Sequence, residues 1–331
     1  MNRFFAVVAI FLVSIIATPF VVQAQAIGFD NEVTILTIPE YPKPFETMTL
    51  KARSFSTDLD IAQFNWIVNG KTYKQGTGVK DISVTMGKPG TLTVVSVVIK
   101  TKNGQTTTQT FSFRPADVTL LWEADTYKPP FYRGHTTAAF GSTFRITAIP
   151  EFFDKKGVRM NPKDLVYTWK KNYEIVGEAS GYGKDSFITT KTGYLDEDEN
   201  ISVEVSSPRE SVIGSTHVTI SPTTPKVLFY ENNPALGVLF NKELGGSVNT
   251  DASSIDLFTA PFGMSQSNRN NPINIDWSSG NTSLTDFLSK RFITIDNRLN
   301  LVPLSVQFQS TKKLLQSATG QIVVSFTKSN E

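Results

Sequence analysis

The sequence predicts an all-β protein: three β-sandwiches in tandem behind an N-terminal signal peptide. Three observations support this prediction. After an apolar N-terminus the chain reads as short strands separated by turns, two proline-containing segments divide it, and tryptophans recur at near-regular intervals. Alternation of apolar and polar residues with a period of two is typical of half-buried strands, whereas helical periodicity is almost absent. The 331 residues are 40% hydrophobic, which is enough for packed cores.

The N-terminus has the organisation of an export signal. A short positive start, Met1-Asn2-Arg3, precedes a nearly unbroken apolar run from Phe4 to Val22, and Ala24-Gln25-Ala26 offers a small-x-small cleavage pattern. We expect residues 1–26 to be removed after Ala26, since Pro19 breaks the apolar run near its end. The alternative is an uncleaved anchor, because the run is long enough to span a bilayer. Either way the protein is expected to be exported, to an extracellular, cell-surface or periplasmic location.

Strand-like runs follow one another along the rest of the chain. Asn69-Gly70 and Asn103-Gly104 are flanked by such runs, and Asn-Gly pairs favour tight hairpins with positive φ at both turn positions. Five runs alternate or are rich in β-branched residues, as half-buried strands require, namely residues 33–38, 91–99, 110–113, 118–122 and 201–205.

Two short segments divide the chain into units of similar length. Arg114-Pro115-Ala116-Asp117 and Ser221-Pro222-Thr223-Thr224-Pro225 each lie between the closing strand of one unit and the opening strand of the next. They predict sandwiches over residues 27–115, 116–222 and 223–331, each the common size of one sandwich domain. Linkers this short leave little free hinge, so we expect a semi-rigid rod.

An internal repeat supports this division. Trp66, Trp169 and Trp277 each lie within a strand-like run and follow one another at intervals of 103 and 108 residues. The strand before the tryptophan also recurs, over residues 146–152 and 257–262, and self-similarity at a fixed period indicates tandem units. We expect each tryptophan on a central strand as part of the structural core, filling the space between the two sheets.

The first unit resembles PKD and related bacterial immunoglobulin-like domains over about residues 30 to 115. Lys88-Pro89-Gly90-Thr91-Leu92-Thr93-Val94 and the hairpin that follows resemble the closing hairpin of those domains, and residues 64–71 resemble their central tryptophan strand. The second and third units, with residues 129–134 and 230–237 before their strand pairs, are similar to uncharacterised exported proteins of candidate-phylum bacteria. The resemblance implies an Ig-like/PKD-like fold for the array.

Composition excludes several classes of function. A formal charge of +2 gives no electrostatic reason to expect nucleic acid or an anionic membrane as partner. The absence of cysteine excludes disulfide scaffolds, thiolate metal sites and cysteine nucleophiles, and no nucleophile elbow or phosphate-binding glycine loop is present. His135 and His217, the only histidines, are expected at ordinary surface positions. We therefore predict that the protein is not an enzyme.

One acidic cluster raises the question of a metal. Asp196, Asp198 and Glu199 lie in the densest run of carboxylates in the chain, and such oxygens are the ligands that calcium prefers. The run lacks the spacing of a known calcium loop, and acids beside a strand also suppress edge pairing. A solvated turn is the favoured interpretation and calcium the alternative. No other metal or cofactor is predicted.

One aromatic segment is the best candidate for ligand binding. Tyr127, Phe131, Tyr132 and Phe140 cluster around Pro129-Pro130, and exposed aromatic rings favour interfaces with sugars and proteins. The alternative, which we favour, is that they pack against Trp122 and seal the junction between the first and second units.

These observations predict an exported, non-catalytic protein with a structural or adhesive role at the cell surface. A carbohydrate or surface-polymer binding module, carried by the aromatic segment, is one alternative. An accessory enzyme whose site no motif reveals is another. The expected partner is an unidentified surface protein or polymer, with membrane contact only through the N-terminal segment if that segment is kept.

Overall fold

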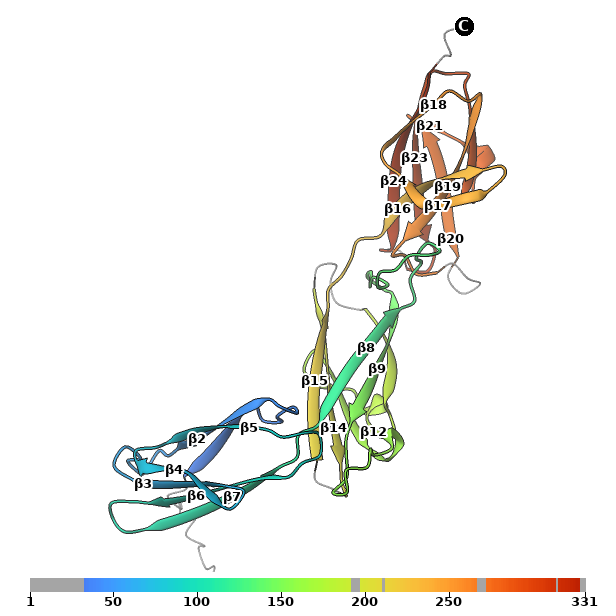
Figure 1. The fold of residues 1–331 in the computed structure, drawn as a ribbon. Helices are drawn as coiled ribbons and strands as arrows, with labels where there is room; N and C mark the ends of the chain where they lie inside the picture. The colour runs from blue at the N-terminus through green and yellow to red at the C-terminus, as the bar shows by residue number, and fades with distance from the viewer. Residues whose placement is uncertain (1–32, 192–196, 210–211, 267–271, 314, 328–331) are drawn as a thin grey trace, which may run out of the picture.

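The chain folds into three consecutive β-sandwiches (Figure 1). The structure is a computed structural model that describes residues 33–191, 197–209, 212–266, 272–313 and 315–327. The predicted signal peptide, residues 1–26, lies outside the described residues. Within them, only three single-turn 3₁₀ helices interrupt the strands, and none is long or apolar enough to cross a membrane. The fold class is therefore all-β with Ig-like sandwiches in tandem, as the sequence predicts.

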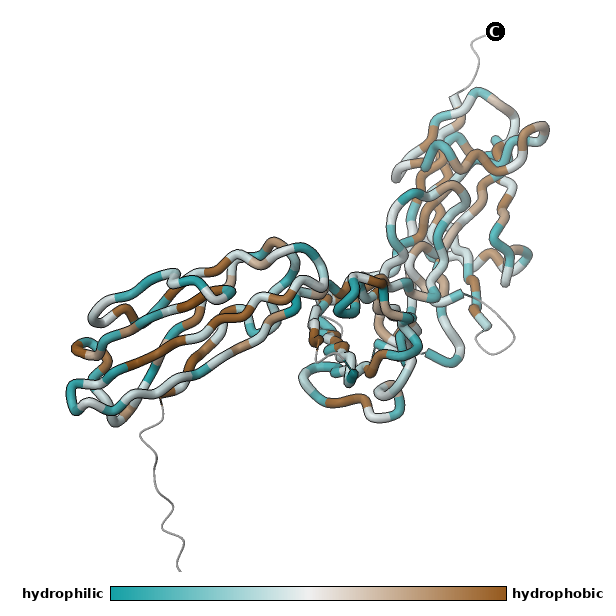
Figure 2. Tube along the Cα trace, turned by 60° about the horizontal axis from the view of Figure 1, so that its bottom comes forward, coloured by the Kyte–Doolittle hydropathy of each residue, from teal (hydrophilic) through white to brown (hydrophobic). Residues whose placement is uncertain are grey.

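The first sandwich packs a three-stranded sheet, in the order β1-β2-β5, against a four-stranded sheet, in the order β4-β3-β6-β7. Its strands are β1 (Thr34–Ile38), β2 (Thr47–Arg53), β3 (Gln63–Val68), β4 (Lys71–Thr77), β5 (Asp81–Thr85), β6 (Thr93–Lys100) and β7 (Thr106–Phe113). Alternate residues of β2, β5 and β6 are buried, which is the period-two pattern that one solvated and one covered face produce. Figure 2 shows hydrophobic residues recurring along the strands of this sandwich.

The second sandwich repeats this strand order, with β13-β9-β8 facing β11-β10-β14-β15. Its elements are β8 (Asp117–Ala124), β9 (Thr143–Glu151), η1 (Pro162–Asp164), β10 (Val166–Lys171), β11 (Glu174–Ile175), η2 (Gly177–Ala179), β12 (Gly181–Tyr182), β13 (Ser186–Thr190), β14 (Glu199–Ser207) and β15 (Val212–Ile220). The short β12 pairs with β10 beside the main path. A long connection between β8 and β9, which we name the tip loop (residues 125–142), distinguishes this sandwich from the first.

The third sandwich keeps the same core and adds two strands, in the sheets β17-β16-β19-β22 and β18-β24-β23-β20-β21. Its elements are β16 (Lys226–Asn233), β17 (Gly237–Leu244), β18 (Ser247–Thr250), β19 (Ser254–Phe262), β20 (Ile273–Ser279), β21 (Thr282–Ser283), η3 (Thr285–Phe287), β22 (Phe292–Asp296), β23 (Leu301–Ser310) and β24 (Ser317–Phe326). β18 pairs with β24 in parallel, whereas the other pairings are antiparallel. A register shift between β16 and β17 lets the β17 hairpin fold over the outer face of its sheet.

Each sandwich has a tryptophan at the centre of its core. Trp66, Trp169 and Trp277 lie on β3, β10 and β20 and are almost fully buried. Each indole N–H donates to a backbone carbonyl that lies two residues before a strand of the facing sheet. These bonds run from Trp66 to Val79 at 2.8 Å, from Trp169 to Lys184 at 2.9 Å and from Trp277 to Lys290 at 2.9 Å.

The two predicted hairpins differ in their turns. Asn69 and Gly70 both have positive φ between β3 and β4, so the tight turn expected there is confirmed. In the turn between β6 and β7 only Gly104 has a positive φ, so the positive φ predicted for Asn103 is wrong. The physical reason is a longer connection: Thr101 accepts from the Gly104 N–H at 3.0 Å and donates to Gln105 at 2.9 Å, so one left-handed residue closes the turn.

The array is bent rather than straight. The first sandwich lies across the end of the second, whereas the third continues roughly along the second (Figures 1 and 2). The expectation of a rod is therefore wrong at the first junction. Linker length limits how far two sandwiches separate, but the side chains that pack between them fix the angle, and those contacts are described below.

Removing a central tryptophan should destabilise its own sandwich. Trp169→Ala is expected to lower the free energy of unfolding of the second sandwich by about 3–5 kcal/mol, because the cavity it leaves is bounded by two rigid sheets. Urea denaturation followed by circular dichroism would measure this. Tyr173→Ala, which removes an exposed ring, is the control, and an equal loss for both variants would contradict the assignment.

Candidate functional site

The tip loop of the second sandwich docks on the third sandwich. The Tyr127 N–H donates to the Met264 carbonyl at 2.7 Å, and the Gly263 N–H donates back to the Tyr127 carbonyl at 2.9 Å. A β-bridge between Thr126 and Ser265 extends this exchange. The loop therefore adds a short antiparallel piece to the end of β19, so the junction has backbone hydrogen bonds as well as side-chain packing.

The Tyr127 ring completes an aromatic cluster on the outer face of the third sandwich. Tyr230, Phe258 and Ala260 form its buried part, and Leu228, Val238, Phe240 and Tyr127 pack against it. The Arg291 guanidinium lies 5.1 Å from the centroid of the Tyr127 ring, within cation–π range. Burial raises the pKa of Tyr127, and Arg291 opposes that rise. One of the four predicted ligand-binding aromatics is thus used for packing between sandwiches.

The other three predicted aromatics divide between junction and surface. Tyr132 packs edge-to-face on Phe262 of the third sandwich, with centroids 5.1 Å apart. Phe140 is half-buried at the same junction. Phe131 is 92% exposed and has a φ of 65°, a left-handed conformation that is rare for a bulky residue. The packing alternative placed this cluster at the first junction against Trp122, but Trp122 packs on Phe144 inside its own sandwich.

A buried glutamine locks the same junction. The Gln316 amide nitrogen donates to the Phe140 carbonyl at 3.0 Å and to the Ser265 hydroxyl at 3.1 Å. Its amide oxygen accepts from the Ser265 N–H at 3.1 Å. Lys313 donates to the same hydroxyl at 3.0 Å, and burial lowers the pKa of Lys313. Nothing in the sequence marked Gln316, because an amide in a polar segment belongs to no motif.

Two hollows flank the root of the tip loop on the second sandwich. The larger measures about 660 Å³ and the smaller about 460 Å³. Four residues line both of them, namely Glu123, Lys128, Thr136 and Arg145. The larger hollow continues past Asp125, Tyr127 and Ile188, and the smaller past Leu121, Trp122 and His135. These residues were not predicted as a site, because they come from two strands and a loop.

The first junction uses a tyrosine at the equivalent place. Tyr41 follows β1 as Tyr127 follows β8, and it contacts Glu204 on β14 of the second sandwich. Burial, and after it the neighbouring carboxylates of Glu204 and Glu40, raise the pKa of Tyr41 to about 12. An ion pair between Lys43 and Asp117 at 3.0 Å crosses the same junction.

A glycine lets the first junction close. Gly90 has a φ of 75°, and a Cβ added there would lie 2.6 Å from the Cβ of Phe153 in the second sandwich. Its N–H donates to the Pro115 carbonyl at 3.1 Å. A side chain at this position would force the two sandwiches apart, so Gly90 helps to fix the bend between them.

The two junction loops share a sequence pattern that we did not predict. Tyr41-Pro42-Lys43-Pro44-Phe45 and Tyr127-Lys128-Pro129-Pro130-Phe131 each place a phenylalanine four residues after the docking tyrosine. Phe45 and Phe131 are both exposed and have φ values of 63° and 65°. Proline in both segments restricts the backbone around the turn. The pattern is visible in the sequence once the two loops are aligned on their tyrosines.

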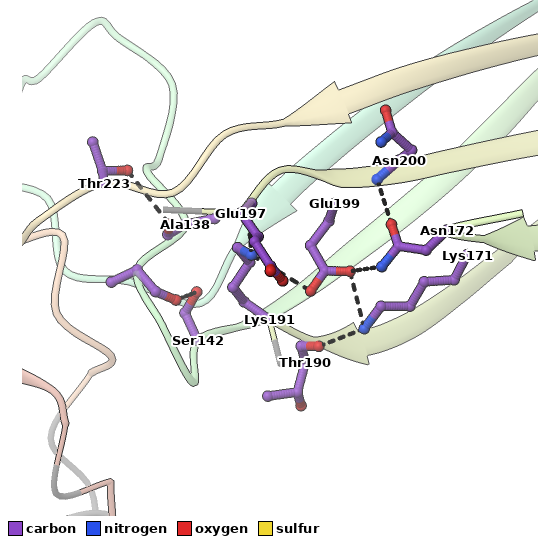
Figure 3. Close-up of polar contacts among 11 residues, drawn as sticks. Ala138, Ser142, Lys171, Asn172, Thr190, Lys191, Glu197, Glu199, Asn200 and Thr223 are labelled. Atoms are coloured by element: carbon purple, nitrogen blue, oxygen red, sulfur yellow. Dashed lines mark hydrogen bonds and ion pairs between the residues drawn. The ribbon is translucent and has the colours of Figure 1, made fainter. Parts of the chain in front are cut away.

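The predicted calcium ligands lie in three different environments. Asp196 lies outside the described residues, Asp198 is exposed, and Glu199 is fully buried at the start of β14. The Glu199 carboxylate lies 3.6 Å from the Lys191 ammonium and 3.3 Å from the Lys171 ammonium (Figure 3).

Further hydrogen bonds complete this buried network. The Asn172 amide donates to Glu199 at 3.3 Å, Lys171 donates to the Thr190 carbonyl at 2.9 Å, and Lys191 donates to the Glu197 carbonyl. The network joins the ends of β10, β13 and β14, which belong to both sheets of the second sandwich. Glu199 is thus engaged by cations of the protein itself, an arrangement that suits a structural tie between sheets.

Both histidines are exposed. His217 lies on β15 and His135 on the tip loop, beside the smaller hollow. In the part of the chain that the structure describes, no three His, Asp or Glu side chains lie close enough together to hold a metal ion.

Breaking the buried network should cost far more than breaking a surface pair. Lys191→Met is expected to lower the free energy of unfolding of the second sandwich by about 3–5 kcal/mol, because Glu199 stays buried with one ammonium fewer. Lys163→Met removes the pair between an exposed lysine and the half-buried Asp185 and should cost at most about 1 kcal/mol. Urea denaturation compares the two, and similar losses would contradict the structural role.

The first junction should lose stability at alkaline pH. Ordinary tyrosines ionise near pH 10, whereas Tyr41 ionises at about 12 in the folded protein. Its contribution to stability is therefore complete below about pH 10 and is lost as the pH rises toward 12. Phenolate absorbance should show one late-titrating group fewer in Tyr41→Phe. Tyr167, whose pKa burial also raises to about 12, should titrate late in both proteins.

Known proteins similar to this chain are found among solved structures, at low sequence identity. No protein-family model matches the chain, and neither does any curated protein sequence. Among solved structures, the three N-terminal domains of the bacteriophage RB49 highly immunogenic outer capsid protein (Hoc) are 10% identical, cover 90% of this chain and 99% of their own, and give a TM-score of 0.25.

Two other tandem arrays are similar to a comparable degree. The central fibronectin-III array of RIM-binding protein is 13% identical, covers 90% of this chain and 97% of its own, and gives a TM-score of 0.32. The immunoglobulin domains 1–5 of Sidekick-1 are 10% identical, cover 91% of this chain and 60% of their own, and give a TM-score of 0.28.

Proposed function

We propose that the protein is an exported, non-catalytic component of the cell surface, whose three sandwiches act as a stiff, bent spacer with an adhesive role. The observation that carries this proposal is that both junctions are braced by the same kind of loop. In each, a tyrosine that follows the first strand of one sandwich, Tyr41 or Tyr127, contacts the outer face of the next sandwich.

Bracing at both junctions gives the array a defined length and bend. Flexible linkers alone would let the sandwiches reorient, since domains within a chain move relative to one another unless their interface is extensive. The second junction combines backbone hydrogen bonds, the aromatic cluster and the buried amide of Gln316. A spacer of fixed shape presents surface residues at a set distance and direction, which suits a structural or adhesive role.

The non-catalytic part of the proposal rests on the chemistry of the surface. His135 and His217 are exposed, and neither has an ion-pair partner among the described residues. The hollows beside the tip loop carry charged groups of both signs, without a nucleophile held against a base. Export is supported by the apolar N-terminal run and its cleavage pattern.

Weakening the second junction should broaden the range of shapes. The chain contains no cysteine, so spin labels can be attached at Thr119→Cys and Thr294→Cys, two exposed strand positions in the second and third sandwiches. Gln316→Ala leaves a buried carbonyl and N–H unpaired, at about 1–3 kcal/mol for each group. This variant should widen the distribution of distances between the two labels, measured by double electron–electron resonance. Tyr127→Ala should widen that distribution further.

The spin-label experiment has a control variant. Tyr173→Ala, which removes a ring that is 86% exposed, should leave the distribution unchanged. A wild-type distribution as broad as that of the variants would contradict a stiff spacer.

Mass spectrometry of medium, envelope and cytoplasm in the native host tests the location of the protein. Recovery of the intact chain from the cytoplasm alone would refute the surface role.

A further inference from the structure

We infer that the two hollows beside the tip loop form one binding site for a neutral carbohydrate chain. The inference rests on the proposed adhesive role and names the ligand through which adhesion would act. Glu123, Lys128, Thr136 and Arg145 line both hollows, so the hollows adjoin and one extended ligand can reach across these residues into each. Their volumes, about 660 and 460 Å³, lie in the range of small-molecule sites.

The charges at the site balance. Glu123 and Asp125 supply two carboxylates, and Lys128 and Arg145 supply two cations. A site for an anionic polymer would carry excess positive charge, and a cation site would carry excess carboxylate. A balanced set of donors and acceptors instead matches hydroxyl groups, which both donate and accept.

Three of these charged groups have unused hydrogen-bonding capacity. Arg145 lies opposite Glu123 across the β8–β9 pair, yet it has no hydrogen-bond or ion-pair partner in the described ranges. The pair between Lys128 and Glu123 is long, at 3.9 Å, and exposed. A guanidinium presents parallel N–H donors, which can bind two neighbouring hydroxyls of one sugar ring.

Apolar surface adjoins these polar groups. Ile188, which is 58% exposed, lines the larger hollow, and Leu121, which is 56% exposed, lines the smaller. Both extend from the outer face of the sheet formed by β13, β9 and β8. Sugar rings have C–H faces as well as hydroxyls, so polar groups beside aliphatic side chains suit them better than either kind alone.

The junction holds the site open before any ligand arrives. The Ala124 N–H donates to the Thr136 hydroxyl at 2.8 Å, and the Thr126 hydroxyl donates to the Thr137 carbonyl at 2.8 Å, which fixes the two limbs of the tip loop together. Tyr127 then anchors the loop to the third sandwich. A preformed site avoids the entropic cost of ordering a loop on binding.

The test is affinity electrophoresis of the full chain in gels that contain soluble polysaccharides. The neutral probes are galactomannan, xylan, dextran and β-1,3-glucan, and the anionic probes are alginate and hyaluronate. We expect retardation by at least one neutral polysaccharide, at a level that salt does not change. Arg145→Met and Glu123→Gln should each weaken binding about tenfold or more. Arg298→Met, which removes an exposed arginine of the third sandwich, is the matched control and should bind as the wild type does.

Three results would overturn the assignment. These are no retardation by any neutral polysaccharide, retardation by the anionic probes alone with loss in salt, and equal binding by wild type and Arg145→Met. The spin-label distances of Arg145→Met, measured in parallel, should equal those of the wild type. A protein with normal distances that binds no polysaccharide would refute this inference and leave the spacer proposal intact.

Discussion

The bond between each central tryptophan and the facing sheet organises every sandwich. The strand that carries the tryptophan belongs to one sheet, and the carbonyl that accepts its indole N–H leads into a strand of the other. Because the chain has no cysteine, no disulfide joins the two sheets. Burial of the tryptophan and its hydrogen bond therefore help to hold the facing sheets together. Because the acceptor lies two residues before its strand in all three cases, the sandwiches are repeats in hydrogen bonding as well as in strand order.

The same repetition extends to the junctions, where it produces different geometries. Tyr41 contacts the sheet that contains β14, whereas Tyr127 contacts the sheet that contains β16 and β19. One kind of loop therefore meets opposite sheets of the following sandwich, and the two junctions differ in direction.

The sequence predicts the sandwiches well, but it predicts poorly the contacts between facing sheets and between neighbouring sandwiches. Period-two alternation is a local signal of a residue's own strand, and the spacing of Trp66, Trp169 and Trp277 is a repeat that can be read directly from the sequence. The pairing of Glu199 with Lys191 and Lys171 depends on how strand ends from both sheets meet, and acids beside a strand read as a solvated turn. Gln316 becomes a lock only because the tip loop brings Phe140 to it.

The aromatic residues of the tip loop lie beside the hollows that we propose as a ligand site, but their rings are not the groups that we assign to it. Rings near prolines are typical both of ligand platforms and of packing between domains, and sequence alone does not separate the two. In the structure Tyr127 and Tyr132 contact the third sandwich, so their rings are engaged at the junction. That engagement fixes the loop, and the fixed loop bounds the hollows lined by Arg145 and Glu123. Packing between the sandwiches therefore shapes the surface that we propose for the ligand.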